Sequence, residues 1–448
     1  MEAELLTVAL TFVVAAVVVA LIAYLATSKG WKTTEDALHS EAVAAEPEPK
    51  LKPKAQSAKS KKDHRFKDKQ TVATFNHPWL CTSLKGHAGR VLDMDFSSNG
   101  RNLVSCSEDR GLLLWHLKDF GEREHKSARG SVELDTAKFI KFAPDSKSLI
   151  LCLAGGNSLS VYKLVKKEGA STVKFESVEG KEFPEKHRRE IVSIGIASTG
   201  KFIMSASADN TLIVWDLHGQ VLHTIDTKQS NIYRAAVSTC GRFVASSGFT
   251  PDVKVWEVQF DRASGTFKDV VRAFELKGHS SGVYAFDFNQ DSTRMVSASK
   301  DGTWRLWDTD IRYTQGQEPY LLCSGGLPHL RSASEENVFA ALAPNGSSFA
   351  IGIGTVLHAF EAGAPEEGET IEDPHQLPLT GIRFSYDGKY LATCGDKHIR
   401  VFHNVSGYRA QLKIFRKQIV KPQGEAHKRR LEESCKQLED KLQQILGN

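Results

Sequence analysis

The sequence predicts an all-β domain assembled from seven repeated units and joined to a membrane by one N-terminal helix. Three observations support this prediction. A five-residue motif recurs three times with constant spacing, four weaker copies occupy the remaining stretches up to about residue 404, and an uncharged apolar run lies within residues 1–26. Repetition at a period of about 20 to 50 residues is typical of solenoids and radial arrays.

The three clear copies share a histidine, two serines, an aspartate and a tryptophan. In each copy the tryptophan lies 28 residues after the histidine and six after the aspartate. A buried imidazole and carboxylate need hydrogen-bond partners, which an indole N–H and a hydroxyl supply. Since a single active site would not be copied three times, the pattern indicates a structural network and not a hydrolase triad. The copies are His87, Ser105, Ser107, Asp109 and Trp115; His187, Ser205, Ser207, Asp209 and Trp215; and His279, Ser297, Ser299, Asp301 and Trp307.

These residues resemble the WD40 repeat family, whose repeats begin with Gly-His and end with Trp-Asp, here Gly278-His279 and Trp307-Asp308. The resemblance implies a seven-bladed β-propeller over residues 75–415, with four antiparallel strands in each blade. It also implies that the apolar stretch 78–84 closes the ring by joining the last blade. The resemblance further implies that one hydrogen-bonded tetrad locks each clear blade, and we assign the tetrads to His87, Ser107, Asp109 and Trp115; His187, Ser207, Asp209 and Trp215; and His279, Ser299, Asp301 and Trp307.

The four weaker units keep the rhythm of strand, turn and strand but lose most of the motif. Since strand patterning persists in them, we expect seven units of about 45 residues each. The aromatic residues at the tryptophan position are Tyr162, Trp256, Phe360 and Phe402, in units 137–164, 230–258, 335–361 and 375–404.

An apolar run of 21 residues without a charge covers residues 5–25. As a helix it spans roughly 31 Å, enough to cross a hydrocarbon core of about 30 Å. A cleaved signal peptide is the alternative, but Glu2 and Glu4 stand where such a peptide carries basic residues, and the run is longer than a signal-peptide core. We therefore expect an uncleaved transmembrane anchor over residues 1–26.

The charges that flank this run predict its orientation. No lysine or arginine precedes the run, whereas Lys29 and Lys32 follow it and more lysines continue through residues 27–74, which we expect to be a disordered basic linker. By the positive-inside rule, everything after the anchor lies in the cytosol. Seven cysteines without a CxxC pair agree with a reducing compartment. The linker either contacts anionic lipid or serves as a solvated spacer.

The C-terminal residues 416–448 predict a basic amphipathic helix. Its apolar stripe suits docking on the propeller, docking on a partner or self-association, and two heptads are too few for a firm coiled-coil prediction. The basic run upstream leaves contact with RNA or acidic lipid open as an alternative to a solvated face, which we favour. The stripe is formed by Leu431, Cys435, Leu438, Leu442 and Ile445.

The sequence predicts no enzyme, no cofactor and no metal site. Residues 195–201 match the GxxxxGK core of a phosphate-binding loop, but Phe202 replaces the Ser or Thr that would bind magnesium. A turn between two strands explains this match better. The signatures HExxH and DxDxDG are absent from the sequence.

The predicted function is a non-enzymatic scaffold that binds protein partners. The resemblance to anchored WD40 proteins covers the whole chain and implies the endoplasmic-reticulum membrane. It also implies a partner surface around the central channel, near the strand that follows Gly-His, where Arg and Tyr are typical of binding hot spots. A guanine-nucleotide exchange factor, a ubiquitin-ligase adaptor and an RNA-associated adaptor are the alternatives. The expected surface residues are Arg90, Arg188, Arg189, Tyr233 and Tyr284.

Overall fold

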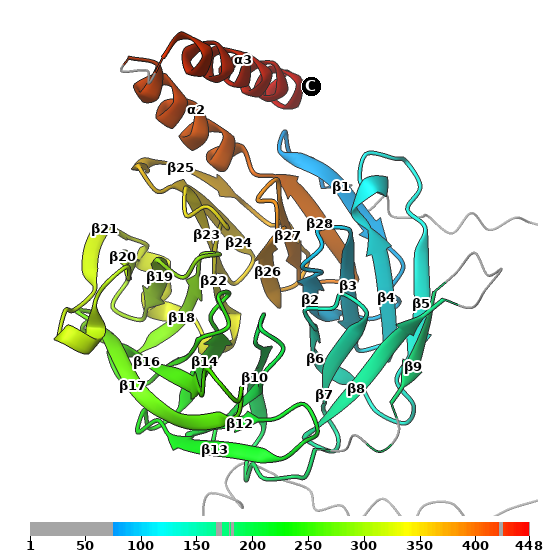
Figure 1. Cartoon of the computed structure of the whole chain (residues 1–448). Coiled ribbons are helices and arrows are strands. Elements are labelled where there is room, and N and C mark those ends of the chain that lie inside the picture. The colour runs from blue at the N-terminus through cyan, green and yellow to red at the C-terminus, as the bar shows by residue number, and fades with distance from the viewer. Residues whose placement is uncertain (1–74, 167–172, 179, 181–182, 421–423, 448) are drawn as a thin grey trace, which may run out of the picture. The chain divides into compact units, whose positions relative to one another are not determined.

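The strands of the computed structural model form a ring of seven antiparallel sheets around a central axis (Figure 1). The structure describes residues 75–166, 173–178, 180, 183–420 and 424–447. Within these residues, each sheet contains four strands, and the predicted seven-bladed all-β propeller is confirmed. The predicted anchor and linker lie outside the described residues.

Blades 1 to 4 are numbered in chain order, and the innermost strand of each blade comes first. Blade 1 contains β2 (Val91–Phe96), β3 (Asn102–Ser107), β4 (Gly111–His116) and β5 (Ser127–Ser131). Blade 2 contains β6 (Ala137–Phe142), β7 (Ser148–Leu153), β8 (Ser158–Val165) and β9 (Lys174–Ser177). Blade 3 contains β10 (Ile191–Ile196), β11 (Ile203–Ser207), β12 (Thr211–Trp215) and β13 (Val221–Asp226). Blade 4 contains β14 (Ile232–Val237), β15 (Phe243–Gly248), β16 (Asp252–Phe260) and β17 (Phe267–Lys277).

Blades 5 to 7 complete the ring, and the last blade takes one strand from the start of the propeller. Blade 5 contains β18 (Val283–Phe288), β19 (Arg294–Ser299), β20 (Thr303–Asp308) and β21 (Tyr320–Gly326). Blade 6 contains β22 (Val338–Leu342), β23 (Ser348–Ile353), β24 (Val356–Glu361) and β25 (Ala364–Ile371). Blade 7 contains β26 (Gly381–Phe384), β27 (Tyr390–Cys394), β28 (His398–His403) and β1 (Leu80–Lys85). Short 3₁₀ turns cover Leu117–Asp119, Tyr313–Gln315, Pro328–Ser332 and Glu335–Asn337.

The core consists of layers between neighbouring blades, because both faces of each sheet are covered. Successive side chains of a strand point to opposite faces. Accordingly, Leu103 of β3 packs in the cluster that includes Val401 of blade 7, whereas Val104 packs in the cluster that includes Ile140 of blade 2. This explains why the middle strands are nearly continuous apolar runs and do not alternate with polar residues.

The ring closes when β1 pairs with β28, as the apolar stretch 78–84 led us to expect. Leu84 lies opposite Ile399, and Ser83 lies opposite Arg400. The chain ends of the propeller therefore meet in one blade, although Leu84 and Ile399 are 315 residues apart.

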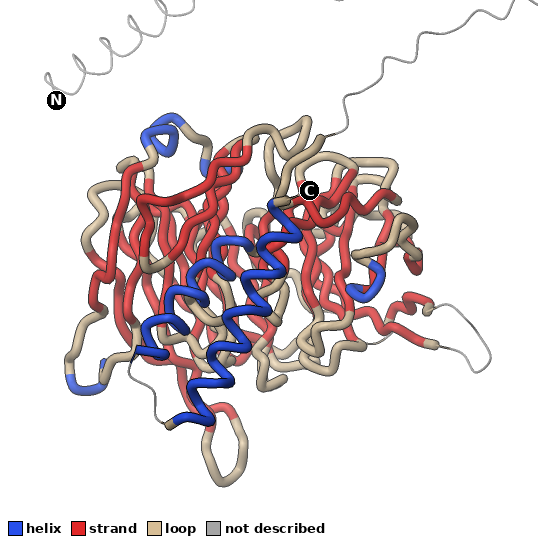
Figure 2. Tube along the Cα trace, turned by 90° about the horizontal axis from the view of Figure 1, so that it is seen from above, coloured by secondary structure: helices blue, strands red, loops and turns tan. Residues whose placement is uncertain are grey.

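Two helices, α2 (Val405–Val420) and α3 (Glu425–Leu446), follow the last strand. Figure 2 shows them side by side and antiparallel across the outside of the strands. The sequence placed one helix after residue 415, but α2 begins directly after β28 because Asn404 caps it, accepting a hydrogen bond from Gly407 N at 2.9 Å. A Cβ on residue 407 would lie 2.3 Å from Asn404 Nδ2, so glycine is required there.

The chain itself covers the apolar stripe of α3. Leu431, Cys435 and Ile445 are buried, and Ile445 joins a cluster with Trp79 and Tyr408. Of the three options left open by the sequence, docking on the propeller is the one observed. Neither α2 nor α3, nor any other helix of the described residues, is long and apolar enough to cross a membrane.

Candidate partner-binding face and blade tetrads

The tetrad of blade 5 is a closed chain of hydrogen bonds. His279 Nδ1 lies 2.9 Å from Asp301 Oδ2, and His279 Nε2 lies 2.8 Å from Ser297 Oγ. Trp307 Nε1 donates to the same Ser297 Oγ at 2.9 Å. The loop before the innermost strand, the second strand and the third strand are thus tied together.

Blade 1 repeats this arrangement. His87 Nε2 lies 2.8 Å from Ser105 Oγ, which accepts a hydrogen bond from Trp115 Nε1 at 3.1 Å. The other ring nitrogen of His87 lies 3.3 Å from Asp109 Oδ1.

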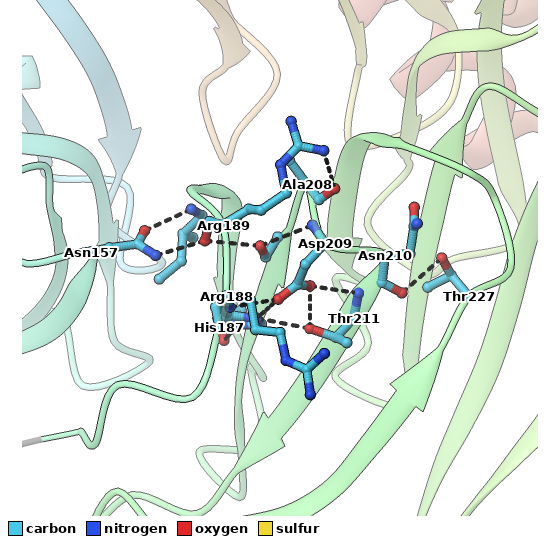
Figure 3. A network of polar contacts seen from close by, with 12 residues as sticks. Asn157, His187, Arg188, Arg189, Ala208, Asp209, Asn210, Thr211 and Thr227 are labelled. Carbon is cyan, nitrogen blue, oxygen red and sulfur yellow. Dashed lines mark hydrogen bonds and ion pairs between the residues drawn. The ribbon is translucent and has the colours of Figure 1, made fainter. Parts of the chain in front are cut away.

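Blade 3 carries a variant in which a threonine stands between the histidine and the aspartate (Figure 3). His187 Nδ1 lies 2.9 Å from Thr211 Oγ1 and 3.8 Å from Asp209 Oδ2. Asp209 also accepts hydrogen bonds from the backbone N–H groups of Arg188 at 2.7 Å and Thr211 at 2.9 Å. The serine is Ser205, 2.7 Å from His187 Nε2.

The assignment of the second serine of each Ser-x-Ser pair to the tetrads is therefore wrong, because the first serine contacts the histidine and the tryptophan. The misassigned serines are Ser107, Ser207 and Ser299. Leu103 lies opposite Trp115 in the ladder, so Ser105 is the diagonal neighbour of the indole on the same face. The second serine lies a further two residues away, which is about 7 Å along the strand. It instead stabilises the turn: Ser207 Oγ donates to Arg189 O at 3.0 Å and accepts from Asp209 N at 3.2 Å. The signal that could have decided this is the spacing of ten residues between serine and tryptophan.

Blade 7 contains a fourth network, which sequence analysis missed. His375 Nε2 lies 2.8 Å from Thr393 Oγ1, with the same separation of 18 residues as in the other tetrads. Arg400 Nη1 donates to His375 Nδ1 at 2.7 Å and to Asp396 Oδ2 at 3.1 Å. Phe402 lies at the position that tryptophan occupies in the other tetrads, but its side chain has no N–H. In this network Thr393 takes the place of the serine, and Arg400 supplies the N–H donor that tryptophan would supply.

The protonation states follow from burial. Burial lowers the pKa of the tetrad histidines, which are therefore neutral at physiological pH; these are His87, His187, His279 and His375. Burial alone would raise the pKa of Asp109, but hydrogen bonds from the N–H groups of Ala88 and Gly111 outweigh it and lower this pKa to about 2. A neutral imidazole whose two nitrogens are both engaged has no free position for catalysis.

Two of the predicted partner-binding residues do not lie open on the surface. The Arg90 guanidinium donates to Gly395 O at 2.9 Å and to Pro378 O at 2.8 Å, and it joins blade 1 to blade 7. Tyr284 is only 2% exposed, and its hydroxyl donates to Ala333 O at 3.0 Å. Both side chains help to hold the ring together. Burial contradicts the assignment of Tyr284 to a partner surface, whereas the assignment of the half-buried Arg90 stays a prediction.

The remaining three predicted residues reach solvent to different degrees. Arg188 and Arg189 are exposed beside the blade 3 tetrad, and Arg189 Nη1 donates to Ala208 O at 3.1 Å (Figure 3). Tyr233 is partly buried and lies 5.7 Å from the ring of Tyr284. Of the five predicted residues, only these two arginines are exposed, and Arg189 uses one of its N–H groups within the blade.

Sequence analysis missed three exposed apolar side chains at the same end of the propeller as these arginines. Leu134 lies between β5 and β6, Phe249 between β15 and β16, and Leu377 between β25 and β26. Because successive strands alternate in direction, loops that enter a blade and turns between its second and third strands lie at one end. The exposed fractions are 95%, 62% and 47%, respectively. We call Leu134, Arg188, Arg189, Phe249 and Leu377 the tetrad-end face.

Comparison with known proteins supports the repeat assignment. The WD domain, G-beta repeat family matches residues 79–116, 181–216, 271–308 and 369–403. Transducin beta-like protein 2 of Mus musculus is 43% identical over 427 residues, which are 95% of this chain and 95% of that protein. The chain belongs to the transducin beta-like protein 2 family. The Homo sapiens member is 44% identical over 397 residues, 88% of each chain.

A more distant relative extends the comparison beyond this family. The guanine nucleotide-binding protein subunit beta-1 of Nicotiana tabacum is 24% identical over 285 residues, which are 59% of this chain and 68% of that protein. The four matched repeats coincide with blades 1, 3, 5 and 7, the blades that carry a histidine network. The repeat signal therefore follows the hydrogen-bonded network.

The phosphate-loop match of this family member lies in a β-hairpin. Gly195 belongs to β10, Gly200 occupies the turn with a φ of 66°, and β11 follows at Ile203, where a phosphate-binding loop would start a helix. Lys201 Nζ lies 5.0 Å from the centre of the Phe260 ring. Among the described residues, no three His, Cys, Asp or Glu side chains are grouped so that they could hold a metal ion.

Proposed function

We propose that this chain is a membrane-anchored, non-enzymatic scaffold whose propeller holds a protein partner on the cytosolic face of the endoplasmic reticulum. The observation that carries the proposal is the tetrad-end face, which combines exposed apolar side chains with two exposed arginines. Exposed apolar anchors beside arginine are typical of protein-binding hot spots. The predicted anchor and its flanking charges support the membrane part of the proposal.

Partner binding is tested with matched variants at the two ends of the propeller. Phe249→Glu places a charge on the tetrad-end face, whereas Leu217→Glu changes an exposed leucine between β12 and β13, at the opposite end. Proximity labelling from the full-length protein in cells should lose its main labelled proteins with the first variant only. Identical labelling profiles for wild type and both variants would refute the proposed face.

The cytosolic orientation is tested at an exposed glycosylation sequon. Asn345 is exposed in the turn between β22 and β23 and precedes Gly346-Ser347. Asn404, the second sequon, is 6% exposed, and its Nδ2 donates to Gly388 O at 2.8 Å, so only Asn345 is informative. We expect Asn345 to stay unmodified and the propeller to be digested by protease added to sealed microsomes. A glycosidase-sensitive mass shift abolished by Asn345→Gln would place the propeller in the lumen.

An RNA-associated adaptor is the second candidate, because exposed cations gather on the helices. Lys417, Arg429 and Arg430 are exposed and form no ion pair among the described residues. Phosphate contacts from such residues weaken steeply with salt. Ultraviolet cross-linking to RNA in cells, compared with Lys417→Glu/Arg429→Glu, tests this candidate. Loss of cross-linking with retained partner labelling would assign the two activities to separate surfaces.

A further inference from the structure

The central channel of the propeller is a cavity of about 430 Å³. All seven innermost strands contribute to its lining, and so do the turns between the first and second strands, including Ser98 and Tyr386. The cavity therefore extends toward the end opposite the tetrad-end face. Its volume falls in the range of small-molecule sites, which is about 300–1,000 Å³.

The channel wall carries three carboxylates and three cations. Within it, Lys141 Nζ forms an ion pair with Asp93 Oδ2 at 2.8 Å. Asp95 and Asp287 each use one oxygen to accept a backbone N–H from the next blade, that of Phe142 at 2.8 Å and that of Leu342 at 2.9 Å, respectively. Each of these two carboxylates keeps a second oxygen for another donor. The six groups are Asp93, Asp95, Lys141, Arg234, Asp287 and Arg383.

The two arginines are poorly engaged. Arg234 Nη2 donates to Val338 O at 3.5 Å, and Arg383 Nη1 donates to Ile382 O at 3.5 Å. Within the described part of the chain, neither guanidinium has a carboxylate oxygen within the 4.0 Å of an ion pair. Both side chains are half-buried, and the Arg234 guanidinium stacks on the ring of Phe339, 4.2 Å from its centre. Since a guanidinium offers five N–H donors, most of these donors stay available to a ligand.

The pKa shifts of the channel groups are those expected for charges that lie in one partly desolvated cavity. Burial raises the pKa of Asp287 to about 6 and also raises that of Asp95. Burial and the positive charge of Arg383 together lower the pKa of Arg234 to about 10. Burial alone would also lower the pKa of Arg383, but the charges of Asp93, Asp287 and Asp95 outweigh it and raise this pKa. Both guanidinium groups line the same cavity, so an oxyanion inside it would be attracted by both.

We propose that the channel binds a small dipolar molecule, whose phosphate or carboxylate lies between Arg234 and Arg383 and whose ammonium or hydroxyl donors face Asp95 and Asp287. The three carboxylates and three cations balance one another, so the site favours a ligand that carries both an anionic group and a donor group over a simple anion. The innermost strands β2, β14, β18 and β26 hold the four groups, and the rigid ring presets their positions. This site is independent of the tetrad-end face.

The test is isothermal titration of the full-length protein in detergent with phosphoethanolamine and with L-serine. We expect one of these probes to bind with one-to-one stoichiometry, and the identity of that probe distinguishes a phosphate from a carboxylate. Inorganic phosphate and ethanolamine, which each supply one end, should bind at least about tenfold more weakly. Binding by neither probe overturns the proposal.

Matched variants locate the binding. Arg383→Gln and Arg234→Gln should each weaken the bound probe at least about tenfold, since a charged hydrogen bond is lost. Arg101→Gln removes an exposed arginine from the β2–β3 turn next to the cavity and should leave affinity unchanged. If either arginine variant fails to fold, Asp287→Asn takes its place, because it keeps the shape of the channel wall. This variant should also weaken the binding of the probe. Equal affinity in wild type and all folded channel variants overturns the proposal.

Discussion

Replacing Ser205 by alanine tests the tetrad assignment directly. Its Oγ accepts the indole N–H of Trp215 at 2.8 Å and lies 2.7 Å from His187 Nε2, and the serine is 0% exposed. Ser205→Ala leaves two buried polar groups without a partner, at about 1–3 kcal/mol each. We expect a loss of about 2–6 kcal/mol, a large share of the roughly 5–15 kcal/mol that stabilises a typical folded protein.

The matched control is Ser207→Ala, two residues further along β11. Ser207 is also fully buried, but its partners are the backbone groups Arg189 O and Asp209 N. Arg189 O keeps a hydrogen bond from Asn157 Nδ2 at 2.7 Å when the hydroxyl is removed. We expect a loss of about 1 kcal/mol. In thermal unfolding of the full-length variants, followed by tryptophan fluorescence, the Ser205→Ala variant should have a clearly lower melting temperature than the Ser207→Ala variant.

A double-mutant cycle measures the coupling energy between the Ser205 hydroxyl and the indole N–H of Trp215. Trp215→Phe removes the N–H, so adding it to Ser205→Ala should cost less than it does in the wild-type background. Additive losses, or a Ser207→Ala variant that is as unstable as Ser205→Ala, would refute the assignment of Ser205 to the tetrad.

Three further predictions concern the blade aspartates, the tetrad histidines and the β10–β11 hairpin. Asp209→Ala removes the acceptor of two backbone N–H groups and should lower stability by about 1–3 kcal/mol, whereas Asp252→Ala should cost less in the same melts, because Asp252 Oδ1 has no hydrogen-bond partner. The tetrad histidines have lowered folded-state pKa values, so the unfolded chain binds more protons and stability should fall as pH drops below about 6.5. Stability that instead rises over this range would contradict neutral buried histidines. Lys201→Ala should leave titration with ATP and GTP unchanged, and a loss of nucleotide binding would contradict the hairpin interpretation.

Much of the fold could be predicted because the information is periodic. The spacing from histidine to tryptophan and the alternation of strands predicted seven repeated units, and the resemblance to WD40 repeats implied the propeller and its closure by the apolar stretch before the first Gly-His. The serine was misassigned because both serines of Ser-x-Ser lie on one face of the strand, and only the cross-strand register of Trp115 with Leu103 distinguishes them. The network of blade 7 was missed because Arg400 and Thr393 replace the usual side chains.

The partner surface was harder to predict because β-bulges redirect side chains at the start of the innermost strands. In blades 4 and 5 the ladder shifts register around Tyr233 and Tyr284, and the two rings turn toward each other. A bulge adds a residue to one strand and re-aims its side chain, so exposure cannot be inferred from alternation there. Blades 1, 2 and 3 shift at the equivalent position, around Leu92, Lys138 and Val192.

Closure of the ring and docking of the helices stabilise the same blade. The entropy cost of joining ends 315 residues apart grows as (3/2)RT ln n, or about 5 kcal/mol. Trp79, which is 4% exposed, packs with Tyr408 of α2 and Ile445 of α3. Burial of about 200 Å² of indole contributes about 5 kcal/mol, so this one side chain offsets the closure cost. Because the pocket of Trp79 is completed by α2 and α3, the two helices act as part of the closure of the propeller and are not an independent appendage.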